Sequence, residues 1–194
     1  IIITIDGSGA DNIDGLAGER DSLDLNRDQW ERHKVLMTSF TIWEGRNNKI
    51  IPVKMVDRTI FNPGFYWSRV TKEIFGLGTL YDPRGDQAGT VMGMAALGDP
   101  EKYSYHFKNM MTKKGHNELE AGVFPIDGEK LIEEANKSDQ NKFDIAAALQ
   151  KETENILLSL ITPSILKYNT KNVCLSGGVS LNCVFTGKLF DYFP

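Results

Sequence analysis

Residues 1–9 read Ile-Ile-Ile-Thr-Ile-Asp-Gly-Ser-Gly. The first five side chains are all β-branched and show no polar alternation, which predicts a strand that is covered on both faces. The next four residues are polar or glycine, and glycine adopts positive φ without steric cost, so they predict a tight turn directly after the strand. The same arrangement returns near the other end of the chain: residues 173–175 predict a short buried strand, and Ser176-Gly177-Gly178 predict a turn into a helix.

The segments between these two turns alternate in a recognisable order. A hairpin connection over 44–48 separates two strand-like runs. Pro52 lies in the second run, 49–56, and places it at a sheet edge or a bulge. The predicted strands are 35–43 and 49–56, and the predicted helices are 65–75, 91–97, 128–137, 143–168 and 179–190. Three meandering strands followed by alternating helix and strand are typical of the ribonuclease-H-like half of an actin-like ATPase (ASKHA) fold. We therefore expect an α/β structure with a mixed sheet and flanking helices.

Length and composition are those of a globular protein. The chain has 194 residues, of which 41% are hydrophobic and 25% charged, and by the scaling of surface with mass this is enough for one domain. We expect residues 1–194 to form a single partial domain, with the polar segments 10–34 and 101–139 as insertions. Because the chain begins without Met, directly in a strand-like run, we also expect it to be a fragment.

Charge and cysteine content restrict the possible partners. The 22 basic and 26 acidic side chains give a net charge of −4, which disfavours nucleic acid or an anionic membrane as the main partner. No apolar run approaches the roughly 18 residues of a membrane span. Two cysteines are too few for a disulfide framework, which favours a cytoplasmic setting, and both are expected in the core.

The two glycine turns carry the candidate chemistry. Closely spaced backbone N–H groups without Cβ atoms can cradle a phosphate, although two strands that simply need tight turns would give the same pattern. Neither turn matches a dinucleotide-binding or P-loop motif. Asp6 at the end of an apolar strand predicts either a metal ligand or an Asx turn. The three histidines, His33, His106 and His116, are scattered and expected at the surface, and no catalytic residue is identified.

Three segments resemble the O-carbamoyltransferase family of the nodulation and antibiotic-tailoring (NodU/CmcH) type. Residues 3–9 are similar to the family's strand followed by D-G-x-G. Residues 64–76 and 91–98 look like its G-x-x-Y-S-x-x-T-x-x-L-G and V-M-G-L-A-x-Y-G. Residues 175–183, Leu-Ser-Gly-Gly-Val-Ser-Leu-Asn-Cys, are close to its G-G-V-A-L-N-C. The segments occur in the family's order, and the resemblance covers residues 1–190 with insertions.

The resemblance implies a transferase that moves a carbamoyl group from carbamoyl-adenylate to the hydroxyl of a small-molecule alcohol. Carbamoyl-adenylate is made from carbamoyl phosphate and ATP by a YrdC-like domain, expected in the same full-length chain, so the fragment alone is expected to be inactive. Asp6 falls on a ligand of an iron-like divalent metal whose other ligands are expected outside this chain. The residues that fall on nucleotide-binding positions are Gly7, Ser8, Gly9, Gly177, Gly178 and Asn182.

Two other functions stay open at this point. Another actin-type ATPase, such as a sugar or acetate kinase, shares the fold, but such enzymes show D-x-G-x-T on the first turn and here Ala10 follows Gly9. A non-catalytic nucleotide-binding module is the third possibility. Nucleotide titration and product masses separate the three.

Overall fold

The computed structural model describes residues 1–12, 35–58, 61–78, 87–108, 128–170 and 172–193. Their contacts divide the chain into two compact units. The sheet unit contains the described residues of 1–64 and 159–194, and the helical unit contains those of 65–111 and 121–158. His33 and His116 lie outside the described residues.

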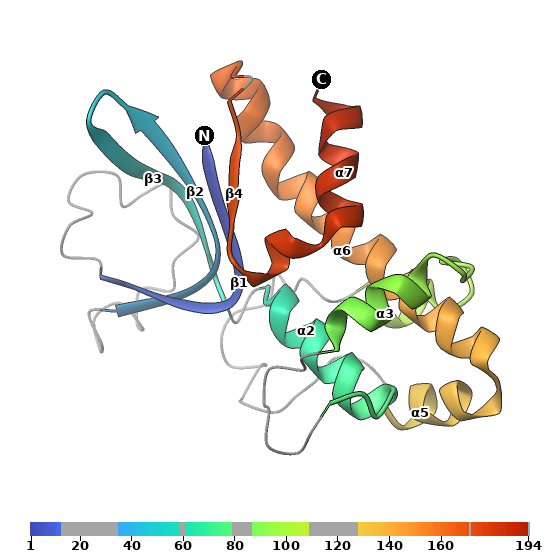
Figure 1. Cartoon of the computed structure of the whole chain (residues 1–194). Helices are drawn as coiled ribbons and strands as arrows, with labels where there is room; N and C mark the ends of the chain where they lie inside the picture. The colour runs from blue at the N-terminus through green and yellow to red at the C-terminus, as the bar shows by residue number, and fades with distance from the viewer. Residues whose placement is uncertain (13–34, 59–60, 79–86, 109–127, 171, 194) are drawn as a thin grey trace. The chain divides into compact units, whose positions relative to one another are not determined.

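The sheet unit is built on a mixed sheet. Its strands are β1 (Ile2–Asn12), β2 (Val35–Arg46), β3 (Lys49–Asp57) and β4 (Cys174–Ser176). They lie in the order β3-β2-β1-β4; β2 is antiparallel to both β1 and β3, whereas β4 is parallel to β1 (Figure 1). The chain is therefore α/β with a mixed sheet and flanking helices, as the element order predicts.

The predicted hairpin of β2 and β3 is confirmed, but its strands are longer than expected. Arg46 pairs with Lys49, which leaves a two-residue connection whose first residue, Asn47, has a φ of 55°. Asparagine tolerates this left-handed conformation, which matches the twist of the flanking strands. Pro52 lies on β3 at an edge of the described sheet, beside a register shift. Both positions predicted for this proline are thus realised.

The tight turn predicted over residues 6–9 is wrong. β1 runs through these residues to Asn12, and β2 stays paired with it on both sides, Ile5 with Phe40 and Gly9 with Thr38. Residues 6–8 therefore lie opposite the single residue Ser39. The sequence is polar and glycine-rich, but β2 pairs with β1 on both sides of it, so these residues are accommodated as a bulge instead of ending the strand.

The core of the sheet unit is apolar and contributed by strands and the last helix. Fully or almost fully buried side chains come from β1, β2, β3 and α7 (Cys183–Tyr192), namely Ile3, Ile5, Phe40, Ile42, Val56 and Phe185. Both cysteines are exposed, so their expected place in the core is wrong. Cys174 lies on the short edge strand β4 and Cys183 is the first residue of α7, and neither place lets a neighbouring element cover it.

The predicted helices are confirmed within a few residues. They are α2 (Pro63–Arg69) with its π-helical continuation η3 (Val70–Ile74), α3 (Ala88–Ala95), α5 (Gly128–Lys137) and α6 (Asp139–Tyr168). The short helix α4 (Ser104–Phe107) was not predicted. The first helix ends at Ile74, two residues before Gly76, which has a φ of 62°. The helix predicted over 179–190 differs at its start, because a 3-10 turn, η5 (Gly178–Leu181), precedes α7.

Trp67 is buried and links α2 to α6 in the helical unit. Its Nε1 donates to the Thr153 hydroxyl at 3.0 Å, and that hydroxyl donates to the carbonyl of Leu149 at 2.8 Å. Only 6% of Trp67 and none of Thr153 is exposed. A buried indole N–H needs such a partner, so Trp67 is a packing residue of the helical unit.

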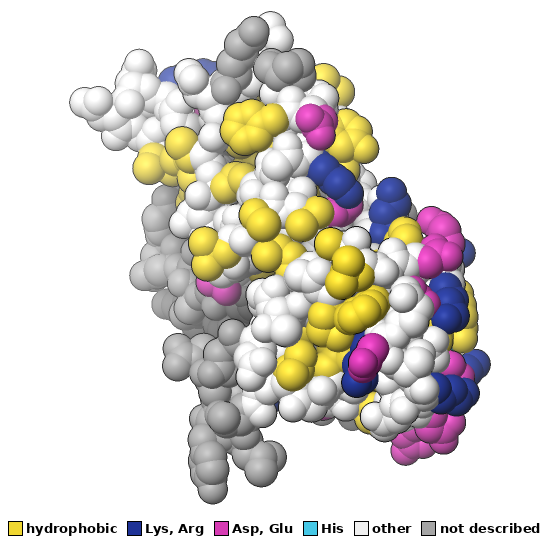
Figure 2. All heavy atoms as spheres, turned by 45° about the vertical axis from the view of Figure 1, so that its right-hand side comes forward, with side chains coloured by type: hydrophobic (Ala, Val, Ile, Leu, Met, Phe, Trp, Pro, Cys, Tyr) yellow, Lys and Arg dark blue, Asp and Glu magenta, His cyan; other side chains and the backbone are white. Residues whose placement is uncertain are grey.

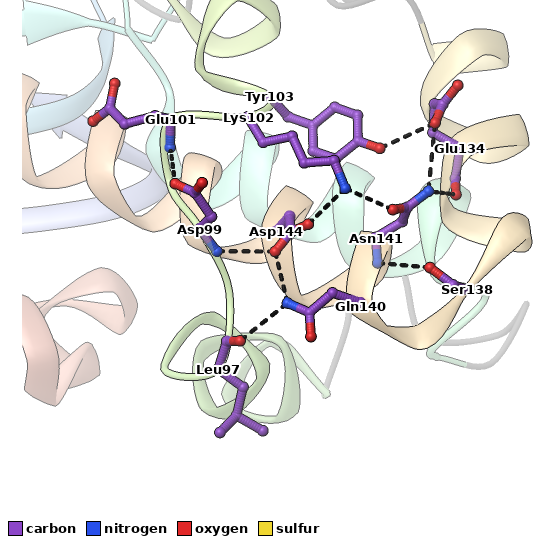
Figure 3. A network of polar contacts seen from close by, with 10 residues as sticks. All are labelled: Leu97, Asp99, Glu101, Lys102, Tyr103, Glu134, Ser138, Gln140, Asn141 and Asp144. Carbon is purple, nitrogen blue, oxygen red and sulfur yellow. Dashed lines mark hydrogen bonds and ion pairs between the residues drawn. The ribbon is translucent and has the colours of Figure 1, made fainter.

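A buried carboxylate joins the segment after α3 to the start of α6 (Figure 3). Asp144 accepts from the Asp99 backbone amide and the Lys102 ammonium, each at 2.9 Å, and from the Gln140 side chain at 2.8 Å. Its side chain is 3% exposed. Burial alone would raise the pKa of this carboxyl, but the three donors outweigh burial and lower its pKa below the usual value. The charged form is thus the one that the fold stabilises.

A second carboxylate extends the same network to α5. Glu134 accepts from the Tyr103 hydroxyl at 3.0 Å and pairs with Lys137, and these two hydrogen bonds hold its pKa below the usual value. Burial, together with the hydrogen bond to Glu134, raises the pKa of Tyr103 to about 12. His106 on α4 is also buried, so its expected place at the surface is wrong; its ring centroid lies 3.9 Å from that of Tyr105.

Removing the Asp144 carboxylate should destabilise the protein. Asp144→Asn leaves buried donors without their charged acceptor, and we expect the free energy of unfolding at pH 7 to fall by about 3 kcal/mol. Because the folded-state pKa is lowered, the wild-type contribution is fully present above the unfolded pKa of about 3.9 and is lost as pH falls through the folded pKa. Urea unfolding across this pH range measures both effects.

Asp139→Asn is the matched control on the same helix. The Asp139 side chain is 79% exposed and pairs with Lys142 at 2.9 Å, so its removal should change the free energy of unfolding by less than about 0.5 kcal/mol. Equal effects of the two substitutions, or a difference that persists unchanged at acid pH, would contradict the role given to Asp144.

Candidate functional site

The two segments that the sequence singles out meet at one end of the sheet. Thr4 pairs with Ser176 in the parallel β1–β4 ladder, so the residues that follow Thr4 and those that follow Ser176 lie next to each other. A Cβ added to Gly178 would lie 3.3 Å from Oδ1 of Asp6. In open α/β sheets, ligands bind outside the carboxyl ends of parallel strands. Gly178 follows the end of β4, and Asp6 lies beside it on β1, just after the parallel pairing of the two strands ends.

Gly177 is required by the packing of the chain itself. Its φ is 96° and its ψ 162°, a conformation that is essentially restricted to glycine. A Cβ at this position would lie 2.3 Å from the carbonyl oxygen of Ile5. The bend after β4 can therefore rest directly on the backbone of β1, and this contact brings the next residue to Asp6.

Gly178, in contrast, is open to solvent. It is exposed, as is Asp6, and among the described residues, its chain neighbours aside, only atoms of the Asp6 carboxyl group lie within 4 Å of where its Cβ would be. The bend around it is closed by Ser180, whose amide donates to the Gly177 carbonyl at 3.0 Å and whose hydroxyl donates to the Ser176 carbonyl at 2.7 Å. The loop is thus held by hydrogen bonds, and it exposes the backbone of Gly178 next to the Asp6 carboxylate.

Asn182 ends this loop and caps α7. Its Oδ1 accepts from the amide of Phe185 at 3.0 Å, the N-cap geometry that satisfies one of the first amides of a helix. Only 9% of Asn182 is exposed. The described part of the structure thus assigns this side chain a contact within the chain, and its expected role toward a nucleotide stays a prediction.

The backbone that follows Asp6 on β1 belongs to Gly7, Ser8 and Gly9. They lie in the bulge between Ile5 and Gly9 instead of the predicted turn. The side chain of Ser8 falls outside what the structure describes. Their role in binding phosphate therefore stays a prediction that rests on their position beside Asp6.

The described residues supply one carboxylate at this site and no complete metal centre. Among them, no three histidine, cysteine, aspartate or glutamate side chains lie close enough together to hold a metal ion. A divalent cation usually takes more protein ligands than one. Asp6 can therefore act only as one ligand of a set that other residues complete.

Thr4 is a site neighbour that sequence reasoning missed. It lies two residues before Asp6, and side chains at this spacing share one face of a strand. Its hydroxyl donates to the Thr41 carbonyl at 3.4 Å and accepts from Nε1 of Trp43 at 3.3 Å. The period of two along β1 is the signal that could have identified it.

None of the described helices combines the length and the apolar character that crossing a bilayer requires. Figure 2 shows hydrophobic side chains on the face drawn, with acidic and basic side chains along its right-hand edge.

Comparison with known proteins identifies the family. Residues 61–193 match the model described as carbamoyltransferase N-terminus. The chain is 27% identical over 115 residues to the uncharacterized protein sll1178 of Synechocystis sp., and 28% identical over 109 residues to the nodulation protein NolO of Bradyrhizobium diazoefficiens. Each alignment covers 51% of this chain and 19% of the relative, so the chain spans about a fifth of the length of these curated relatives. Because the family model matches well over half of its residues, the chain belongs to the carbamoyltransferase family, in the region of that family's N-terminus.

Proposed function

We propose that the protein is an O-carbamoyltransferase that transfers a carbamoyl group from carbamoyl-adenylate to the hydroxyl of a small-molecule alcohol. The family match over residues 61–193 supports the reaction class. The observation that carries the site is the contact of the Gly177–Gly178 bend with Ile5 and Asp6, where the parallel pairing of β1 with β4 ends. We further propose that this domain is the ribonuclease-H-like half of an actin-like core, in agreement with the strand order β3-β2-β1-β4.

The proposed donor is a nucleotide, and bare backbone is suited to hold its phosphate. Gly178 offers an exposed main chain with no Cβ in the way, and Gly7 and Gly9 lie on the adjoining part of β1. Backbone N–H groups at such bends bind phosphate oxygens. Carbamoyl phosphate and ATP are the proposed precursors, and a YrdC-like domain of the same full-length chain is the proposed source of the adenylate.

The proposed reaction is an acyl transfer. The acceptor oxygen forms a bond to the carbamoyl carbon, the bond from that carbon to the adenylate oxygen breaks, and AMP leaves while the hydroxyl proton passes to solvent or a base. The protein's part is to orient the donor and to stabilise charge on the reacting oxygens. Asp6 is proposed as one ligand of an iron-like divalent metal, and no step is assigned to that ion because the described residues do not complete its site.

The reaction is tested by product mass. The complete protein is incubated with ATP, carbamoyl phosphate and a panel of sugar or antibiotic alcohols, and the products are weighed by mass spectrometry. A mass gain equal to a carbamoyl group is expected. A gain equal to a phosphoryl group would show an actin-type kinase, and nucleotide binding without any product would favour a non-catalytic module.

The proposed metal role of Asp6 predicts a specific loss. Asp6→Ala in the complete protein should reduce bound metal, measured by elemental analysis after gel filtration, from stoichiometric to background, because it removes a ligand of a hard cation. Asp191→Ala is the control, since Asp191 is an exposed acid on α7 in the same unit. Full metal content in the Asp6 variant would remove this role.

A further inference from the structure

The loop that brings Gly178 to Asp6 is tied to α7 through one side chain. Asn182 lies between η5 and α7, and its backbone joins both: its amide donates to the Val179 carbonyl at 3.0 Å, and its carbonyl accepts from the Thr186 amide at 3.0 Å. Its side-chain oxygen accepts from the amide of Phe185. The loop therefore ends at a residue that is fixed on both sides.

The helix to which the loop is tied is itself anchored in the core. Phe185 is fully buried, whereas the residues of the loop are exposed or only partly buried: Leu181 is 81% exposed, and no residue of η5 is buried. The side chains of the loop thus contribute little burial, and the loop rests on β1 mainly through its backbone at Gly177. Two hydrogen bonds, from the Ser180 hydroxyl to the Ser176 carbonyl and from the Phe185 amide to Oδ1 of Asn182, add to its rigidity.

We propose that Asn182 is a positioning residue of the nucleotide site: it holds the Gly177–Gly178 bend against Asp6 by capping α7, and it does not itself bind the ligand. The inference rests on the proposed function. A loop that is ordered before binding loses less conformational entropy when the ligand arrives, so the cap contributes to affinity through preorganisation. A direct role would instead use the Nδ2 donors of this side chain, since Oδ1 already accepts from the Phe185 amide.

Three variants of the complete protein separate the two roles. Asn182→Ala removes the cap, whereas Asn182→Ser keeps a good cap acceptor but lacks the carboxamide. Thr186→Ala is a control on the same helix, since it removes only the hydroxyl that donates to the Asn182 carbonyl at 3.2 Å and leaves the cap in place. Isothermal titration with AMP and ATP measures affinity, at a temperature where circular dichroism shows every variant folded.

We expect Asn182→Ala to bind AMP about fivefold more weakly, the factor that corresponds to a typical cap, and Asn182→Ser to restore wild-type affinity. Hydrogen exchange of the backbone amides over 177–185 should follow the same order without ligand, faster in Asn182→Ala and restored in Asn182→Ser. A serine variant as weak as the alanine variant would show a direct contact and overturn the inference alone. Unchanged affinity in Asn182→Ala would overturn it as well, and a wild-type protein that binds neither nucleotide would overturn the proposed function together with it.

Discussion

Gly98→Ala is expected to unfold the helical unit or to destabilise it by at least about 3 kcal/mol. Gly98 follows α3, and a Cβ at this position would lie 2.0 Å from the carbonyl oxygen of Phe143 and 2.6 Å from the amide nitrogen of Asp144. Both atoms belong to the backbone of α6, so neither can rotate away. The segment would have to lift from the helix, which also breaks the 2.9 Å bond from the Asp99 amide to Asp144.

Gly93→Ala is the matched control for this prediction. Gly93 lies in α3, five residues earlier, and no described residue outside the backbone of that helix lies within 4 Å of its added Cβ. Because alanine has a higher helix propensity than glycine, the free energy of unfolding of this variant should rise by about 0.5–1 kcal/mol. Urea unfolding followed by tryptophan fluorescence compares the two, and a Gly98 variant as stable as the Gly93 variant would show that α6 and the segment after α3 do not touch in this way.

Gly177→Ala should have an effect of similar size in the sheet unit. Alanine at a φ of 96° and ψ of 162° is strained by about 1–3 kcal/mol, and its Cβ would also lie 2.3 Å from the backbone of Ile5. The two costs act on the same contact, so we expect β4 to separate from β1 and the free energy of unfolding to fall by roughly 3 kcal/mol or more. Hydrogen exchange of the β1 and β4 amides, together with urea unfolding, measures the change.

Gly178→Ala is expected to disturb the candidate site while leaving the fold stable. Its added Cβ would meet only the flexible Asp6 side chain, at 3.3 Å, so the variant should fold with a free energy of unfolding within about 1 kcal/mol of wild type. Its added methyl group should nevertheless displace the Asp6 carboxylate and weaken nucleotide binding. If Gly178→Ala were as unstable as Gly177→Ala, the distinction between a packed and an open glycine in this bend would be wrong.

The pattern of apolar residues was sufficient to predict most elements, because each is decided by neighbours in the sequence. Pro52, which lacks an amide for a ladder, correctly indicated an edge and a bulge. Residues 6–9 were predicted wrongly because their conformation depends on β2, a strand that begins at Val35. Local preference favoured a turn, and pairing with a distant strand outweighed it.

The site was only partly predictable for the same reason. Asp6 and the glycine bend were identified because each follows a short apolar run, and their meeting follows from parallel pairing of β1 and β4. The cap by Asn182 carried a signal, an asparagine before an apolar helical segment, which was missed because the helix was expected to begin at Val179. The network around Asp144 joins residues about forty positions apart and leaves no pattern in the sequence.

The pairing of Ile2 with Cys174 has a consequence for the order in which the protein folds. On the ribosome, β1, β2 and β3 emerge early and can form their antiparallel meander while β4 is still unsynthesised. At 5–20 residues per second, translation places β4 roughly 6–20 seconds after β3. The part of β1 that carries Asp6 therefore waits, without β4 beside it, until Ser176 has left the exit tunnel, and this late closure between distant segments makes assembly of the site a slow step of folding.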